Sequence, residues 1–166
     1  MSLVSLTKLI TAAQAGQIVS FPTDTVPGLA VLPECAHQLY QAKGRAPAKP
    51  LILLAAQSAD LWPYVSGSPA EQARWQQMAE AHWPGALTLV LPASGKHPQA
   101  MTPLDHSSLG IRVPKHGVAQ RILAITGPLA TTSANRSGEP ALTSLAAIAQ
   151  AFPDVATLDL ATEFGP

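Results

Sequence analysis

At 166 residues, with 47% hydrophobic and 12% charged residues and a formal net charge of zero, the chain cannot be a disordered or highly solvated protein. A chain of this length can bury about two-thirds of its unfolded surface, which predicts a single domain over residues 1–166. Zero net charge argues against a general nucleic-acid coat protein, so a polyanion site must be local if the chain has one.

Hydrophobic periodicity predicts that helices and short strands alternate in the first part of the chain. Residues 5–16 carry one apolar stripe, with Ser5 able to cap the start and Gly16 suited to the end, which predicts a helix. The apolar run at 51–54 is typical of a strand covered on both faces. The predicted elements are a helix over 5–16, strands over 18–21 and 29–32, a helix over 34–42 and a strand over 51–54.

The second part continues the same alternation. Ser68 and Glu71 form a capping box around Pro69, which predicts a helix that runs to about His82. Strands over 87–91, 109–113, 129–132 and 155–158 and helices over 117–125 and 145–152 follow. Interleaved helices and strands predict an α/β fold with a twisted sheet flanked by helices. The sixteen prolines and the irregular stretch 92–107 favour a mixed sheet over a regular doubly wound one.

Two loops stand out for their polar content, and the first is cationic. Lys43, Arg45 and Lys49 share a segment with no acidic residue from Cys35 to Ala59. Residues two apart in an extended segment point the same way, so Lys43 and Arg45 can face one anion. Lysine supplies a compact charge, and arginine a planar fork that binds phosphate oxygens. Taken alone, such a pair is weak evidence, and a solvated loop is the default interpretation.

The second loop carries hydroxyl and amide groups directly after a short apolar run. Thr132, Ser133 and Asn135 can donate hydrogen bonds to a phosphate or a ribose, and Ser133 and Asn135 again have same-side spacing. A capping or turn motif would use serine and asparagine in the same way. A cationic loop and a hydroxyl/amide loop, each beside a predicted strand, together indicate a polyphosphate or nucleotide site.

Two further segments offer groups for a second ligand. Thr23 and Thr25 supply hydroxyls in a polar turn, where Asp24 could accept from an amine, hold a metal-bound water, or bond its own backbone in an ordinary turn. Arg112 lies inside an otherwise apolar strand, and a buried cation requires a carboxylate partner. Asp24, Asp105 and the carboxylate of a substrate are the alternatives.

Several familiar chemistries have no motif in the chain. The phosphate loop G-x-x-x-x-G-K-[ST], the fingerprint G-x-G-x-x-G, and the motifs C-x-x-C, H-E-x-x-H and G-x-S-x-G are absent. We therefore expect no zinc, no organic cofactor and no covalent nucleophile, and a site that works by charge and position. Cys35 is the single cysteine, and no apolar run approaches the roughly 18 residues of a membrane span. The cytoplasm is the simplest location.

Taken together, these segments resemble the YrdC-like family of threonylcarbamoyl-AMP synthases. The matching blocks fall in the order of that family and cover about residues 5 to 152. They are Phe21-Pro-Thr-Asp-Thr-Val-Pro-Gly-Leu29, Lys43-Gly-Arg45 with Lys49-Pro-Leu-Ile-Leu-Leu54, Trp83-Pro-Gly-Ala-Leu-Thr88, Leu109-Gly-Ile-Arg-Val-Pro114, and Pro128-Leu-Ala-Thr-Thr-Ser-Ala-Asn135 with Ser137-Gly138.

The resemblance implies a twisted α/β sheet with a large, positively lined concave cavity. It implies an enzyme that joins L-threonine, bicarbonate (as CO2) and ATP, with Mg²⁺ carried by the ATP, into threonylcarbamoyl-AMP and pyrophosphate. A partner complex would then transfer the threonylcarbamoyl group to an adenosine of tRNA. The resemblance also implies binding of tRNA or double-stranded RNA.

Site residues follow from the resemblance position by position. Lys43 and Arg45 match the K-x-R pair of the family, implied to be catalytic and to bind ATP. Thr132, Ser133 and Asn135 match its second ATP-binding segment. Thr23, Thr25 and Arg112 match positions that hold threonine, with Arg112 as the clamp on its carboxylate. No resident metal site is implied.

The chain departs from the family pattern in two places. Pro27 stands where the family has an aromatic residue, which removes a ring near the threonine pocket. The sequence also stops at Pro166, before the Pro-Ser-Thr-Val-Val-Asp-like strand that helps to close the nucleotide site. Either the sequence is a shortened form of the protein or its nucleotide site is more open and weaker.

Two other functions stay open alongside the synthase. One is an adenylating enzyme that uses carbamoyl phosphate, like the YrdC-like module of hydrogenase-maturation carbamoyltransferases. The other is an RNA-binding or ribosome-maturation factor without catalysis, against which the zero net charge argues.

Overall fold

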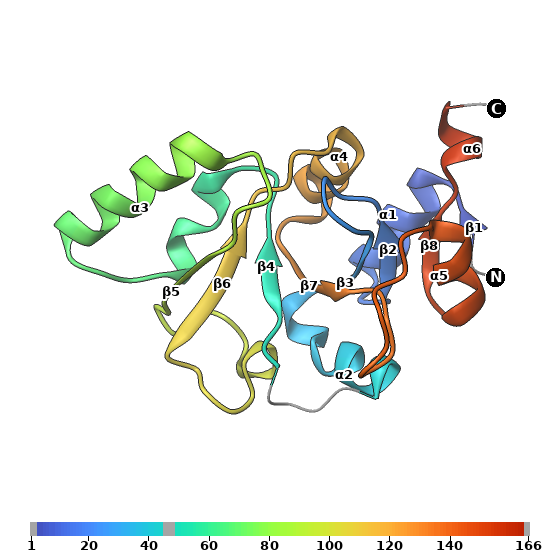
Figure 1. The fold of residues 1–166 in the computed structure, drawn as a ribbon, viewed down its shortest axis with the longest axis horizontal. Coiled ribbons are helices and arrows are strands. Elements are labelled where there is room, and N and C mark those ends of the chain that lie inside the picture. The colour runs from blue at the N-terminus through green and yellow to red at the C-terminus, as the bar shows by residue number, and fades with distance from the viewer. Residues whose placement is uncertain (1–2, 45–48, 165–166) are drawn as a thin grey trace.

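The computed structural model describes residues 3–44 and 49–164. Within them lies one mixed sheet of eight strands in the order β1-β8-β2-β3-β7-β4-β6-β5 (Figure 1). β8 runs parallel to β1 and β2, β4 runs parallel to β6, and the other neighbours are antiparallel. The strands are β1 (Leu3–Val4), β2 (Val19–Phe21), β3 (Gly28–Val31), β4 (Ile52–Leu54), β5 (Leu89–Pro92), β6 (Ser108–Arg112), β7 (Leu129–Ser133) and β8 (Ala156–Leu158).

Helices flank the sheet, and all except α6, which was not predicted, begin and end close to where the sequence predicts. They are α1 (Leu6–Gln14), α2 (His37–Lys43), α3 (Pro69–His82), α4 (Gly117–Thr126), α5 (Leu145–Ala151) and α6 (Leu160–Phe164). The capping box of α3 is confirmed: Ser68 Oγ accepts from the Glu71 N–H, and the Glu71 carboxylate accepts from the Ser68 N–H. The helix predicted over 34–42 is instead a 3₁₀ turn, Pro33–Cys35, followed by α2.

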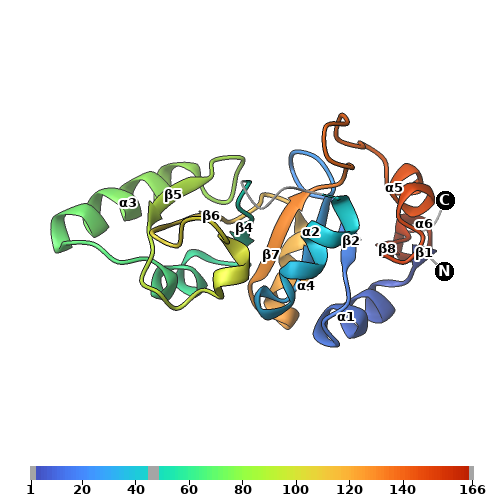
Figure 2. The same cartoon turned by 90° about the horizontal axis from the view of Figure 1, so that it is seen from below.

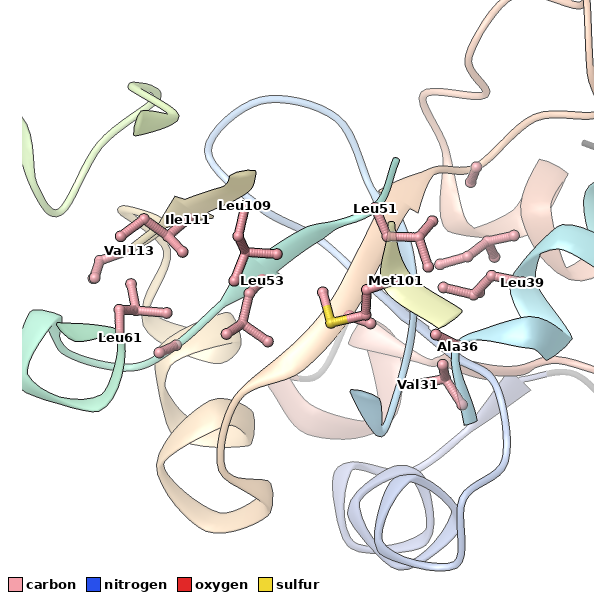
Figure 3. Packing of buried hydrophobic residues seen from close by; sticks show 14 of the residues in the cluster. Val31, Ala36, Leu39, Leu51, Leu53, Leu61, Met101, Leu109, Ile111 and Val113 are labelled. Carbon is pink, nitrogen blue, oxygen red and sulfur yellow. The ribbon is translucent and has the colours of Figure 1, made fainter. Parts of the chain in front are cut away.

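The core consists of two apolar clusters on opposite faces of the sheet. On β4, Leu53 belongs to one cluster and Leu54 to the other, as successive strand residues must. Leu39 of α2 and Ile148 of α5 pack in the first cluster, part of which is drawn in Figure 3. Helices α1 and α4 cover the second face. Central strand β4 is therefore covered on both sides, as its apolar run predicts.

Helix α3 contacts this core through few residues, of which the partly buried Trp75 packs against the first cluster. It lies beside the edge strand β5, at the end of the molecule away from β1 and α6 (Figures 1 and 2). Of its residues, Ala79 alone is buried. The segment that follows α3 is held by Trp83, whose ring stacks on Trp62 with centroids 5.9 Å apart. Among the described residues no helix has the length and apolar character needed to cross a membrane.

The irregular segment before β6 contains a buried histidine, His97. His97 as a whole residue is 5% exposed, and its ring Nε2 lies 2.8 Å from the Thr102 hydroxyl. Burial, helped by the nearby His106, lowers the pKa of His97 below its ordinary value. The folded protein therefore resists protonation of this ring, whereas the unfolded chain takes up the proton near the ordinary histidine pKa of about 6.5.

We expect the melting temperature to fall as the pH drops below about 6.5, because only the unfolded state then gains a proton at His97. The His97→Gln variant should lose part of this pH dependence, whatever its stability at pH 8. Thermal melts between pH 5 and pH 8 measure the slope, with His37→Gln, at an exposed histidine, as the matched control. Equal slopes in wild type and the His97→Gln variant would contradict the assignment.

Candidate nucleotide and amino-acid site

The ammonium of Lys43 joins the two predicted loops. Lys43 is the last residue of α2, and Gly44 ends the helix in a left-handed conformation with φ +57°. The Nζ of Lys43 donates to the backbone carbonyl of Ser133, to Asn135 Oδ1 at 2.9 Å and to Thr132 Oγ1 at 3.2 Å. The Ser137 N–H also donates to the Lys43 carbonyl at 3.0 Å. Residues about ninety positions apart therefore form one polar cluster.

Asn135 builds the loop that carries it. Its Nδ2 donates to the carbonyls of Arg136 at 2.9 Å and Glu139 at 2.7 Å. Its Oδ1 accepts from Lys43 and from the Ser133 hydroxyl at 2.6 Å. Both amide hydrogens of Asn135 are therefore donated to carbonyls of its own loop. In the structure this side chain stabilises a turn, which was one of the two roles that the sequence allowed for it. Asn135 presents an oxygen to Lys43, and the direct donation to phosphate expected of its amide stays a prediction.

Arg45, the second cation of the predicted pair, lies outside the described residues. The chain resumes at Lys49, whose carbonyl accepts from the Tyr40 hydroxyl at 3.2 Å. The same hydroxyl lies 3.2 Å from the carbonyl of Met101, and Met101 O also accepts from the Leu51 N–H at 2.9 Å. The return of the cationic loop into β4 is thus anchored on both α2 and the segment around Met101.

Arg112 forms a second polar cluster. Its Nη2 pairs with Asp24 Oδ1 at 2.5 Å, its Nη1 donates to Thr25 Oγ1 at 3.1 Å, and its Nε donates to the carbonyl of Gly85 at 2.9 Å. Of the two carboxylates of the chain named as possible partners, Asp24 is the one that pairs with Arg112. Asp105 instead accepts from the Ser107 N–H at 2.9 Å. A buried guanidinium thus has the anionic neighbour that its desolvation requires.

The sequence did not single out Gly85 as a partner of Arg112. The turn Trp83-Pro84-Gly85 contains a cis peptide bond before Pro84, and the Gly85 N–H donates to the Val113 carbonyl at 2.9 Å. A Cβ at Gly85 would lie 2.2 Å from the His82 carbonyl oxygen, so this position requires glycine. The partner of Arg112 is the backbone carbonyl of Gly85, which no residue type or spacing in the sequence marks.

Thr23 organises the turn that presents Asp24 and Thr25. Its hydroxyl donates to the Val26 carbonyl at 2.8 Å and accepts from the Thr25 N–H at 3.2 Å. Thr23 therefore makes the local turn bonds that the sequence also allowed for Asp24, which leaves the Asp24 carboxylate for Arg112. Pro27 is buried at the end of the turn. Gly28 follows it in β3, where a Cβ would lie 3.2 Å from the Thr132 carbonyl oxygen.

One cavity lies between the two clusters. It has a volume of about 200 Å³, below the roughly 300–1,000 Å³ typical of ligand pockets, and it is lined by Thr23, Thr25, Val26, Gly28, Ile52, Leu54, Arg112, Thr131, Thr132 and Ser133. Five of the predicted site residues are in this wall, and Lys43 contacts two of them. A larger hollow of about 500 Å³ lies between α2 and α5 and is lined by none of the predicted residues.

The chain is similar to proteins of a known family. A family model described as telomere recombination, which spans the Sua5, YciO and YrdC proteins, matches residues 11–163. The chain belongs to this Sua5/YciO/YrdC family. The resemblance seen in the sequence blocks is therefore confirmed at the level of the family.

Individual relatives agree with this assignment. The chain is 35% identical over 153 residues to a Chromohalobacter salexigens protein named threonylcarbamoyl-AMP synthase, which is 90% of this chain and 80% of the relative. The fold matches Sua5 of P. abyssi in complex with L-threonine, with a TM-score of 0.82 and 30% identity over 95% of this chain. This chain spans about half, 48%, of that protein. YciO of E. coli, at 17% identity and a TM-score of 0.78, matches in fold.

Proposed function

We propose that this chain is an L-threonylcarbamoyladenylate synthase, which converts L-threonine, bicarbonate and ATP into threonylcarbamoyl-AMP, pyrophosphate and water. The observation that carries the proposal is that Lys43 meets the Thr132–Asn135 segment at one end of a cavity while Arg112 and Thr25 lie in the wall of the same cavity. An anion-binding end and a carboxylate-binding end are what two such substrates need. The names of the family relatives support the same activity.

The reaction can be written in two steps. In the first, bicarbonate takes up a proton from the threonine ammonium and loses water to give CO2. The free amine then attacks this CO2, and its nitrogen loses a second proton to solvent to leave a carbamate. An oxygen of the carbamate next attacks the α-phosphorus of ATP. A new P–O bond forms while the bond from the α-phosphorus to the bridging oxygen of pyrophosphate breaks. Negative charge accumulates on the α-phosphate and on the departing pyrophosphate, so charge stabilisation and positioning supply most of the catalysis.

The residues have distinct roles in this scheme. Lys43 and Arg45 would bind the phosphates, a role that the sequence predicts for both. Thr132 and Ser133, which line the cavity, would position them. Arg112 binds the threonine carboxylate, and the Thr25 and Thr23 hydroxyls lie beside it in the cavity wall. Mg²⁺ enters as part of the ATP complex. The product would serve a partner complex that modifies tRNA, and direct binding of tRNA or double-stranded RNA stays a prediction.

We expect pyrophosphate release that requires ATP, Mg²⁺, L-threonine and bicarbonate together. Each component is omitted in turn, and the adenylate is identified by mass spectrometry. Release that needs carbamoyl phosphate in place of threonine and bicarbonate would instead assign a carbamoyl-adenylating enzyme. No release, combined with RNA binding that weakens steeply with salt, would assign a non-catalytic RNA-binding protein.

A further inference from the structure

The ion pair of Arg112 and Asp24 leaves both partners with unused hydrogen-bonding capacity. Arg112 has five N–H groups, and three of them are accounted for by Gly85, Thr25 and Asp24. Asp24 binds through Oδ1, and within the described residues no hydrogen bond reaches its Oδ2. The two side chains keep 11% and 16% of their surface exposed. Arg112 lines the cavity, and Asp24 contacts the same guanidinium.

This pair offers a ligand two opposite charges side by side. A free α-amino acid carries its own two charges on neighbouring atoms, a carboxylate and an ammonium. Its carboxylate can take the remaining N–H groups of Arg112 while its ammonium lies against Asp24 Oδ2. A simple carboxylate has no group for Asp24 and would meet an arginine whose charge is already neutralised.

We propose that Asp24 makes this site selective for zwitterionic α-amino acids over carboxylic acids that lack the amino group. The inference rests on the proposed function for the identity of the amino acid, L-threonine. It assigns to Asp24 the recognition of the ligand's ammonium group, a role that neither the sequence of the segment 21–29 nor the ion pair with Arg112 requires.

The alternative is that Asp24 merely holds Arg112 in place. The guanidinium already has two other anchors, the Gly85 carbonyl at 2.9 Å and the Thr25 hydroxyl at 3.1 Å. The Asp24→Asn change keeps the shape and an acceptor oxygen and removes the charge. A structural role would weaken all ligands of Arg112 alike, whereas a role in selectivity would change their ratio.

The experiment compares L-threonine with 3-hydroxybutanoate, which has the same carboxylate and hydroxyl groups and lacks the amine. Calorimetry on the full chain gives both dissociation constants for wild type, Asp24→Asn, and Asp154→Asn as an exposed control carboxylate. Wild type should prefer threonine by about 10- to 150-fold, the range of one charge-assisted hydrogen bond. In the Asp24→Asn variant this preference should fall at least tenfold, with 3-hydroxybutanoate binding more tightly than to wild type.

Other results would overturn the role of Asp24. One is a preference that stays unchanged in the variant while both ligands weaken together. Another is a wild type with no preference between the two ligands. Failure of the proposed function would look different: a wild type that prefers threonine but releases no pyrophosphate refutes the synthase and leaves the selectivity of Asp24 standing.

Discussion

Lys43→Met should lower the rate of pyrophosphate release by about 100- to 1,000-fold, the range seen when one preorganised donor to a developing anion is removed. Methionine approximates the length of lysine and removes only the charge and the donors. The phosphates would lose their cation at this end of the cavity. The effect should fall on kcat, because the charge matters most when pyrophosphate departs.

The same substitution also tests how the two loops are joined. Without the ammonium, Asn135 Oδ1 and the Ser133 carbonyl lose a donor that now lies within hydrogen-bond reach of both. Because Lys43 is 3% exposed, water cannot easily replace it, and we expect a lower melting temperature as well. Steady-state kinetics and a thermal melt separate the two effects.

A matched control is available for this test. Lys96→Met removes an exposed lysine from the irregular segment before β6 and should change neither turnover nor melting temperature. If Lys43→Met keeps wild-type turnover, the ammonium serves only to hold the loops together. The anion-binding end of the cavity would then have to be assigned to other residues.

The fold was predictable where periodicity was strong and less so where elements were short. The apolar run at 51–54 and the capping box at Ser68 predicted β4 and α3. β1, with two residues, and α6, with five, are too short to show a period, and both were missed. The order of the strands in the sheet could not be predicted either, because no sequence pattern near β4 indicates that it lies between β7 and β6. That order depends on contacts between distant segments.

The residues of the candidate site were also predictable only in part. Residue types and spacing singled out Lys43, Ser133, Asn135 and Arg112, because cations and amides next to strands are unusual enough to notice. The sequence positions could not identify the partner of Arg112, because Asp24 and Asp105 are equally plausible carboxylates when only the sequence is known. The choice follows from the turn bonds made by Thr23, which free Asp24 for the pair. Backbone partners such as the Gly85 carbonyl leave still less trace in a sequence.

Arg112→Gln should raise the KM for L-threonine by about 100-fold or more and leave the KM for ATP within a few-fold of wild type. Glutamine keeps an amide donor but has neither the charge nor the fork that a carboxylate needs. It also leaves the partly buried Asp24 carboxylate without its ionic partner, so the variant should be less stable than wild type. A loss of activity alone would therefore not distinguish a binding role from a folding role.

The double variant Arg112→Gln with Asp24→Asn separates these roles. Replacing both charges by amides of similar shape removes the stranded carboxylate, so the melting temperature should recover most of the loss seen in the single variant. Threonine binding should not recover, because the guanidinium is still missing. Recovery of the threonine KM together with stability would show that Arg112 only supports the fold, and the carboxylate-binding end of the cavity would lose its main residue.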